Sequence, residues 1–220
     1  MGKPVKLTDQ GKAWAKKKPS TRLVDVRPQR ERLLIVCEGS KTEPNYFDSI
    51  KALMPKHIAE VIDVDGQGFN TQSLVNHAQG IRDKKKKTDY PYDEVWVVFD
   101  KDSFEPDKFD NAIHSAEAMG MKVAWSNEAF ELWYILHFVA RQSAMSRTEY
   151  KDCLTKHLGT PYQKNDPDMH SKLKEKGNEA DAVQRAIQLQ ESHIGTPHHS
   201  QNPCTKVNEL VEKLNSFINQ

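Results

Sequence analysis

The stretch that decides the fold is Leu33-Leu34-Ile35-Val36-Cys37, which leads directly into Glu38-Gly39. A second stretch of the same kind, Val95-Trp96-Val97-Val98-Phe99, leads into Asp100-Lys101-Asp102. Apolar runs of about five residues with β-branched members, bounded by polar residues, are typical of strands buried on both faces of a parallel sheet. Because functional groups gather beyond the carboxyl ends of such strands, we expect the three carboxylates to share one crevice.

The rest of the chain alternates in the same rhythm. Strands are expected near 33–37, 59–64, 94–99 and 121–125, and helices near 43–54, 71–86, 107–119 and 129–139. Strands separated by helices predict βαβ units with right-handed crossovers. Beyond residue 141 only helices are expected, near 148–158, 169–191 and 205–219. The fold class is therefore α/β, a mainly parallel sheet flanked by helices with a C-terminal helical extension.

This pattern divides the chain into three parts. Residues 1–31 are polar and rich in Lys and Arg, which indicates a basic flexible arm that orders against a partner or serves only as a solubilising tail. Residues 32–140 form the expected catalytic domain, and residues 141–220 form the helical extension. The net charge of +1 neither requires nor excludes a nucleic-acid partner, so the local distribution of charge matters more.

Composition also restricts the compartment. Three cysteines at irregular spacing give no disulfide framework, which favours a reducing compartment. No apolar run of about 18 residues is present and the start of the chain lacks a signal-peptide core, so no membrane association is expected. We expect a soluble, cytoplasmic protein.

The acidic residues after the strands indicate metal chemistry. Alternation at a strand end places Asp100 and Asp102 on one side, with Lys101 directed away. Two carboxylates held close together repel each other unless a cation lies between them, and oxygen ligands suit a hard ion such as Mg²⁺. Glu38 either ligates the metal or acts as general acid or base on a phosphodiester. The alternative is a surface turn that happens to carry acidic residues.

Several further residues are candidates for the same site or for binding its substrate. Glu131, near a helix start, is either stabilised by the helix dipole or a second metal ligand. Lys164 is either a surface residue or a catalytic group that offsets charge at a scissile phosphate. Lys41 belongs to a helix start where backbone amides can meet a phosphate. Lys84, Lys85, Lys86 and Lys87 close a helix, and they either form a solvated face or steer nucleic acid.

The acidic motifs after the two central strands resemble those of a known family. Glu38-Gly39 after one strand and Asp100-x-Asp102 after a later one resemble the Toprim domain of primases, type II topoisomerases and OLD-family nucleases. The surrounding sequence is more similar to that of the RloB-like family of bacterial defence loci. The matching stretches are Ile35 to Phe47, Val98 to Asp102 and Ser126 to Trp133, with a weaker match at Asn202 to Val207.

The resemblance implies a Toprim-like fold and strand cleavage that depends on Mg²⁺ or Mn²⁺. It implies Glu38 as acid or base and Asp100 and Asp102 as metal ligands, and it makes Glu43 the natural match for a further acid. It also implies anti-phage defence by abortive infection, a DNA or RNA substrate (tRNA included), and an ATPase partner encoded in the same operon.

Two other functions are compatible with the residues. The chain could be a non-catalytic effector subunit that binds nucleic acid or nucleotide through the metal site. A strand followed by Asp-x-Asp also marks HAD-like phosphatases, but there the second Asp usually precedes Gly or Val and then Thr. Here Ser103-Phe104 follows, which disfavours that reading.

Overall fold

The computed structural model describes residues 31–66, 68, 71–102 and 105–218. The basic arm expected at 1–31 therefore lies, except for residue 31, outside the described residues.

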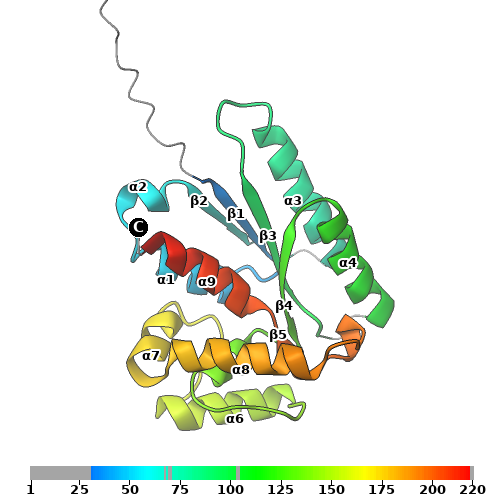
Figure 1. The fold of residues 1–220 in the computed structure, drawn as a ribbon. Helices are drawn as coiled ribbons and strands as arrows, with labels where there is room; N and C mark the ends of the chain where they lie inside the picture. The colour runs from blue at the N-terminus through cyan, green and yellow to red at the C-terminus, as the bar shows by residue number, and fades with distance from the viewer. Residues whose placement is uncertain (1–30, 67, 69–70, 103–104, 219–220) are drawn as a thin grey trace, which may run out of the picture.

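Five strands form one sheet in the order β2-β1-β3-β4-β5 (Figure 1). The strands are β1 (Leu33–Cys37), β2 (Ile62–Gly66), β3 (Glu94–Asp100), β4 (Lys122–Asn127) and β5 (Cys204–Thr205). Strands β1 to β4 pair in parallel and β5 pairs antiparallel to β4. The predicted mainly parallel α/β sheet is confirmed, and it is consistent with a Toprim-like fold.

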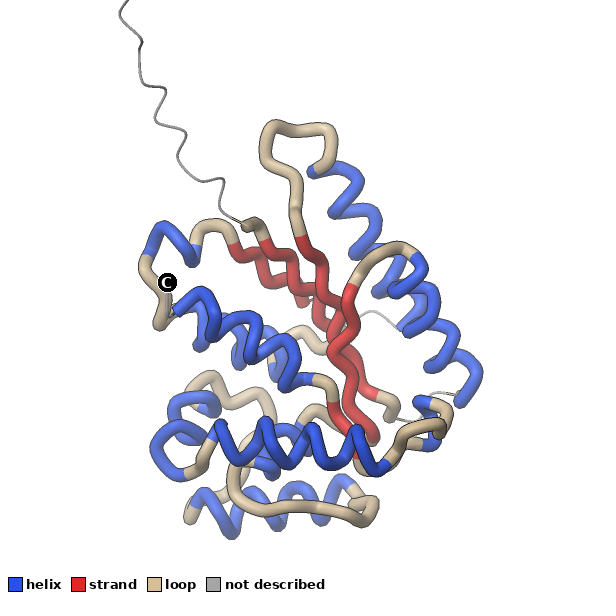
Figure 2. The backbone as a smooth tube through the Cα atoms, viewed as in Figure 1, coloured by secondary structure: helices blue, strands red, loops and turns tan. Residues whose placement is uncertain are grey.

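Helices connect and cover these strands on both faces of the sheet, as Figure 2 shows. They are α1 (Thr42–Lys51), α2 (Lys56–Ala59), α3 (Thr71–Lys85), α4 (Pro106–Ala118), α5 (Glu131–Leu136), α6 (Arg147–Leu158), α7 (Met169–Lys176), α8 (Glu179–Ser192), the 3₁₀ helix η3 (His198–Ser200) and α9 (Val207–Ile218). No helix in the described ranges is long and apolar enough to cross a membrane.

The strand β1 is buried on both faces, as its unbroken apolar run predicts. Leu33 and Ile35 pack into a core cluster that contains residues of α1 and α9, whereas Leu34 and Val36 pack into a second cluster with residues of α3 and α4. Successive side chains of a strand point to opposite faces, so a strand between two helical layers must be apolar throughout. The two helical layers hold β1 and β3 rigidly in the middle of the sheet.

The order of the strands marks where a ligand binds. From β1 the chain passes through α1 and α2 to β2 on one side, and from β2 it returns through α3 to β3 on the other side of β1. The strand order therefore reverses between β1 and β3. In open α/β sheets, ligands bind in the crevice outside the carboxyl ends of the strands at such a point. Glu38 follows β1 directly and Asp100 ends β3, so both residues lie at this switch point.

Three expected elements differ from those observed. The strand expected from residue 59 starts at Ile62, because Lys56–Ala59 form the short helix α2. The single helix expected at 169–191 is two helices: Gly177 ends α7, and the side chain of Asn178 accepts a hydrogen bond from Asp181 N–H to start α8. The helix expected from residue 205 begins at Val207, because Cys204–Thr205 pair with β4.

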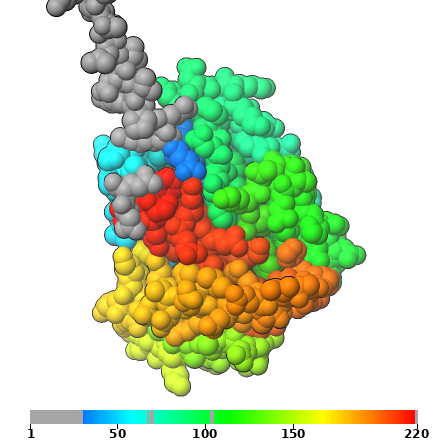
Figure 3. Space-filling view, viewed as in Figure 1, coloured from blue at the N-terminus to red at the C-terminus, as the bar shows by residue number. Residues whose placement is uncertain are grey.

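The C-terminal residues are not packed as a separate extension. β5 joins the sheet, α9 packs on the same face as α1, and residues of α6, α7, α8 and α9 share a core cluster with β1 and β3. In Figure 3 the yellow to red atoms of the C-terminal part lie directly against the blue, cyan and green atoms of earlier residues on the face in view. The packing therefore does not change at residue 141, where the sequence suggests a boundary.

Candidate active site

Glu38 and Asp100 meet at the switch point between β1 and β3. The N–H of Glu38 donates to Val98 O at 2.9 Å, which continues the pairing of β1 with β3 by one residue. The N–H of Asp100 donates in return to Oε2 of Glu38 at 3.2 Å. The carboxyl group of Glu38 is therefore fixed by the neighbouring strand rather than directed into solvent. The structure brings these two predicted site residues into direct contact.

The side chain of Asp100 lies between the sheet and α5. Its Oδ2 accepts a hydrogen bond of 3.1 Å from the N–H of Phe130, immediately before α5. Burial raises the pKa of Asp100 well above its ordinary value, and the nearby carboxylates of Glu43, Glu131 and Glu38 raise it further. Asp100 is thus a carboxyl group whose charge is disfavoured both by desolvation and by neighbours of like charge.

Glu43 is the most deeply buried acid of this group. It lies in the first turn of α1 with only 6% of its surface exposed, and its Oε2 has no hydrogen-bond partner among the described residues. Burial raises the pKa of Glu43, the carboxylate of Glu131 raises it further, and Lys164 opposes the shift. A buried carboxylate oxygen without a partner is costly to keep charged.

Gly39 makes room for Glu43. A methyl group added at Gly39 would lie 2.0 Å from Oε2 and 2.8 Å from the carboxyl carbon of Glu43, far inside contact distance. The Glu-Gly pair after β1 therefore has a steric reason: the glycine lets the acid from the following helix pack against the strand end. Close approach of this kind is a common use of glycine.

The environment of Glu38 suits it to proton transfer. Burial, followed by the charges of Glu43 and Asp102, raises its pKa to about 7, although the hydrogen bond from Asp100 N–H opposes the shift. A carboxyl group with a pKa near neutral can take up or release a proton at physiological pH. This matches the acid or base role that the sequence suggests for Glu38.

Asp102 lies next to these acids but is engaged differently. Its backbone N–H donates to Glu128 O at 3.0 Å, and its backbone has a positive φ of 37°, which is unusual for a residue other than glycine. Its Oδ1 forms an ion pair of 2.5 Å with Nη2 of Arg147, the first residue of α6. The expected metal ligand is therefore paired with a guanidinium in this structure.

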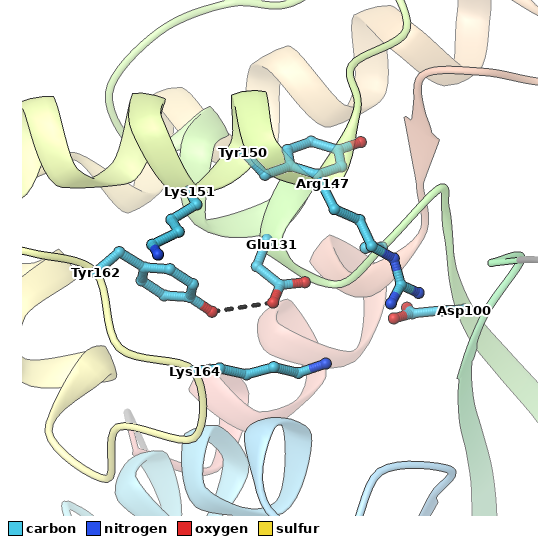
Figure 4. Close-up of a pocket in the computed structure, with 8 residues that line it drawn as sticks. Asp100, Glu131, Arg147, Tyr150, Lys151, Tyr162 and Lys164 are labelled. Carbon is cyan, nitrogen blue, oxygen red and sulfur yellow. Dashed lines mark hydrogen bonds between the residues drawn. The ribbon is translucent and has the colours of Figure 1, made fainter.

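A cavity of about 290 Å³ opens beside Asp100. Figure 4 shows the side chains that point into it, which come from β3, α5, α6 and the segment that follows α6. The lining residues are Asp100, Ala129, Glu131, Arg147, Tyr150, Lys151, Tyr162 and Lys164. Oε1 of Glu131 accepts a hydrogen bond of 3.0 Å from the hydroxyl of Tyr162, which holds the carboxylate in the cavity wall.

The lysines predicted to bind nucleic acid or to stabilise charge on a phosphate lie in three different places. Lys164 lines the cavity, as a role at a scissile phosphate requires. Lys41 is exposed at the N-cap position of α1, at the same edge of the sheet as Glu38. Lys84 to Lys87 close α3 near the loop that leads into the amino end of β3, so they lie at the opposite edge of the sheet from the cavity (Figure 1). Their binding of nucleic acid stays a prediction for a surface remote from this site.

Five of the cavity residues are not among the site residues that the sequence predicts: Ala129, Arg147, Tyr150, Lys151 and Tyr162. Arg147 and Lys151 are four residues apart on α6, so they project from one face of that helix. The spacing is visible in the sequence. The face of α6 that meets the sheet depends on the course of the chain between residues 137 and 147, which no local pattern gives.

The donor set suits a hard divalent cation. Glu38, Glu43, Asp100 and Glu131 supply carboxylate oxygens only, and one of these oxygens is buried without a partner. Across the described ranges, no three His, Cys, Asp or Glu side chains are already gathered closely enough to hold a metal ion. The residues fit Mg²⁺ or Mn²⁺ by their chemistry.

Comparison with known proteins gives one match. No curated protein and no solved structure matches this chain significantly. The family model of RloB-like proteins matches residues 33–214, which covers the sheet, the acidic residues after β1 and β3, and the helices that enclose the cavity. Because that match spans most of the chain, the protein belongs to the RloB-like family.

Proposed function

We propose that this protein is a nuclease that cleaves phosphodiester bonds of DNA or RNA with the help of Mg²⁺ or Mn²⁺. The observation that carries the proposal is the convergence of Glu38, Glu43 and Asp100 at the switch point of the sheet. The pKa of each is raised by burial and by the charges of neighbouring carboxylates. A bound divalent cation would relieve that repulsion and give the partnerless oxygen of Glu43 a ligand.

We assign the metal-binding residues of the proposed site as follows. Asp100, Glu43 and Glu131 would hold the cation, with Glu38 at its side, and Asp102 would join them only by leaving Arg147. When bound, the cation supplies Lewis-acid polarisation of the phosphate.

The chain's own groups have distinct roles in the proposed reaction. Glu38, whose pKa is about 7, takes a proton from the attacking water or gives one to the leaving oxygen. Lys164 lies in the cavity wall, where its ammonium group offsets negative charge that develops on the phosphate. Asp100 is held by Phe130 N–H, so its carboxylate is oriented before substrate binds.

Cleavage assays test the proposal. Purified protein is incubated with single-stranded DNA, duplex DNA and total RNA in Mg²⁺, in Mn²⁺ and in EDTA. We expect cleavage that requires a metal, and a loss of at least about 100-fold in rate for Glu38→Gln and Asp100→Asn. Glu212→Gln, on the exposed side of α9, removes a carboxylate elsewhere and serves as the matched control with unchanged rate.

The alternatives give different results in the same experiment. A non-catalytic binding subunit would retain these nucleic acids in every metal but cut none of them. A HAD-like phosphatase would release phosphate from small phosphomonoesters through an aspartyl-phosphate at Asp100, and it would leave nucleic acid intact. Action in phage defence beside an ATPase partner rests on the family resemblance, and it stays a prediction.

A further inference from the structure

The lining of the cavity carries more basic than acidic side chains. Arg147 and Lys151 project from α6 and Lys164 from the segment after it, as Figure 4 shows. Within the described residues, neither Lys151 nor Lys164 forms an ion pair, although Asp100 and Glu131 line the same cavity. Lys164 acts electrostatically on the buried carboxyl group of Glu43, but neither ammonium group is held in an ion pair with a described residue, so both can contact an anionic ligand.

The helix that carries this charge is fixed at its first turn. Ser146 accepts a hydrogen bond from Glu149 N–H, and Glu149 accepts one of 2.7 Å from Ser146 N–H, which is a complete capping box. Arg147 is the first helical residue, so its backbone position is set by this cap. The amino end of α6, with its positive dipole, therefore lies at the cavity next to the guanidinium.

The guanidinium of Arg147 is held by Asp102. The ion pair joins Oδ1 of Asp102 to Nη2 of Arg147 at 2.5 Å, and the two side chains are 39% and 55% exposed. An ion pair this exposed contributes little to stability. It does fix the direction of a side chain that would otherwise sample many rotamers. The ion pair is made at Nη2, and the guanidinium has five N–H donors in all, so further donors can meet a ligand oxygen.

We propose that Arg147, Lys151 and Lys164 form a phosphate-binding subsite for the nucleic-acid backbone, and that Asp102 is a positioning residue for Arg147. The inference rests on the proposed function, since it names how the same site holds its substrate. A phosphodiester suits this cavity because both of its non-bridging oxygens share a negative charge, which the guanidinium of Arg147 and the two ammonium groups can accept as charge-assisted hydrogen-bond partners.

Binding of a defined probe tests the subsite without relying on cleavage. The probe is a short fluorescein-labelled single-stranded DNA of mixed sequence, and its anisotropy is measured in EDTA from about 50 to about 200 mM salt. We expect Arg147→Gln and Lys151→Gln each to weaken binding about three- to tenfold and to lower the salt dependence by about one unit of slope. Arg147→Lys keeps the charge and should recover part of the loss.

Lys156→Gln is the matched control, because Lys156 is an exposed residue on the same helix and does not line the cavity. It should leave the affinity and the slope close to wild type. If wild-type protein does not bind the probe, or if Arg147→Gln and Lys151→Gln bind like wild type or like Lys156→Gln, the subsite is wrong. Thermal unfolding of each variant shows that the fold is retained.

Asp102→Asn tests the positioning role, and asparagine tolerates the positive φ at this position. We expect this variant to lose as much probe affinity as Arg147→Gln, and the double variant to lose no more than Arg147→Gln alone. Its affinity for Mn²⁺ alone should stay within about threefold of wild type. A tenfold loss of Mn²⁺ affinity, or unchanged or stronger probe binding, would show that Asp102 does not act through Arg147.

The experiments distinguish failure of the phosphate-binding subsite from failure of the proposed nuclease activity. Wild-type protein that binds the probe through Arg147 and Lys151 but cuts nothing in any metal would overturn the nuclease and leave the subsite. Metal-dependent cleavage that survives Arg147→Gln and Lys151→Gln with unchanged KM would overturn the subsite and leave the nuclease.

Discussion

Gly39 and Glu43 occupy positions that depend on each other. Oε2 of Glu43 lies where a methyl group on Gly39 would come within 2.0 Å of it, so the carboxyl group of Glu43 can keep this position only while residue 39 has no side chain. The two residues lie on either side of the turn from β1 into α1. This relationship links a backbone requirement after a core strand to the placement of a carboxylate in the candidate active site.

Gly39→Ala should therefore damage the site as well as the fold. The new methyl group forces Glu43 away from the strand end, and we expect a loss of about 1–3 kcal/mol in the free energy of unfolding. We also expect at least a tenfold loss of Mn²⁺ affinity, because one carboxylate of the cluster is displaced. Urea unfolding and a Mn²⁺ titration on the same preparation measure the two effects.

Gly177→Ala provides a glycine substitution of similar steric severity far from the acids. Its methyl group would lie 2.8 Å from Cβ of His137 and 2.9 Å from Leu173 O, so about 1–3 kcal/mol of stability should be lost here too. Mn²⁺ affinity should stay at the wild-type level. Equal loss of metal affinity in both glycine variants would mean that general destabilisation, and not the displacement of Glu43, explains the effect of Gly39→Ala.

The raised pKa of Glu38 predicts a specific pH dependence. Its folded pKa is about 7 against an ordinary value of 4.5, so between these values the folded state binds the proton and the unfolded state releases it. Without metal, this group's contribution to stability therefore falls as the pH rises from about 4.5 through about 7. The carboxyl group is partly exposed, and after allowing for solvent screening the effect is on the order of 1–2 kcal/mol.

Glu38→Gln removes this effect together with the charge that Glu38 exerts on Asp100. Burial lowers the pKa of His137 to about 4, which acts in the opposite direction by destabilising the fold as the pH falls below about 6.5. Comparison of the two proteins cancels that contribution. In urea unfolding with EDTA, the glutamine variant should equal wild type near pH 4.5 and exceed it near pH 8. A constant difference across this range would show that Glu38 titrates normally.

Tyr162 should matter through Glu131. The hydroxyl of Tyr162 donates a hydrogen bond of 3.0 Å to Glu131 in the cavity wall, and the ring itself is buried. Tyr162→Phe keeps the ring and removes only the hydroxyl, so we expect a loss of about 0.5–1.5 kcal/mol in stability. Metal-dependent cleavage should fall several-fold, because the carboxylate of Glu131 is no longer held. Glu131→Gln combined with Tyr162→Phe should be no slower than Glu131→Gln alone.

Much of the fold could be predicted because the central strands are apolar throughout. The run from Leu33 to Cys37 matches β1 residue for residue, and the acidic residues after β1 and β3 meet because adjacent parallel strands end at one edge. These are local or nearly local signals. They place Glu38 and Asp100 correctly without any knowledge of the rest of the chain.

The features of the fold and site that the sequence does not predict depend on contacts between distant segments. Nothing near Asp102 in the sequence indicates that Arg147 will pair with it, since the two meet only after α5 and the following loop have folded over the sheet. The break at Gly177 depends on the approach of His137, and the short strand β5 is two residues long with a partner on β4. Such features are set by tertiary packing, which outweighs the local helical pattern.

The central claim is that Glu43, Asp100 and Glu131, with Glu38 beside them, form a site for a divalent cation, and calorimetric titration of Mn²⁺ into the full chain tests it most directly. Wild-type protein and Glu212→Gln should bind Mn²⁺ with the same Kd and release protons at pH 7, because carboxyl groups with raised pKa values ionise as the metal enters. Asp100→Asn should bind at least about tenfold more weakly. Mn²⁺ binding that is absent from wild type, or equally tight in Asp100→Asn, would contradict the account.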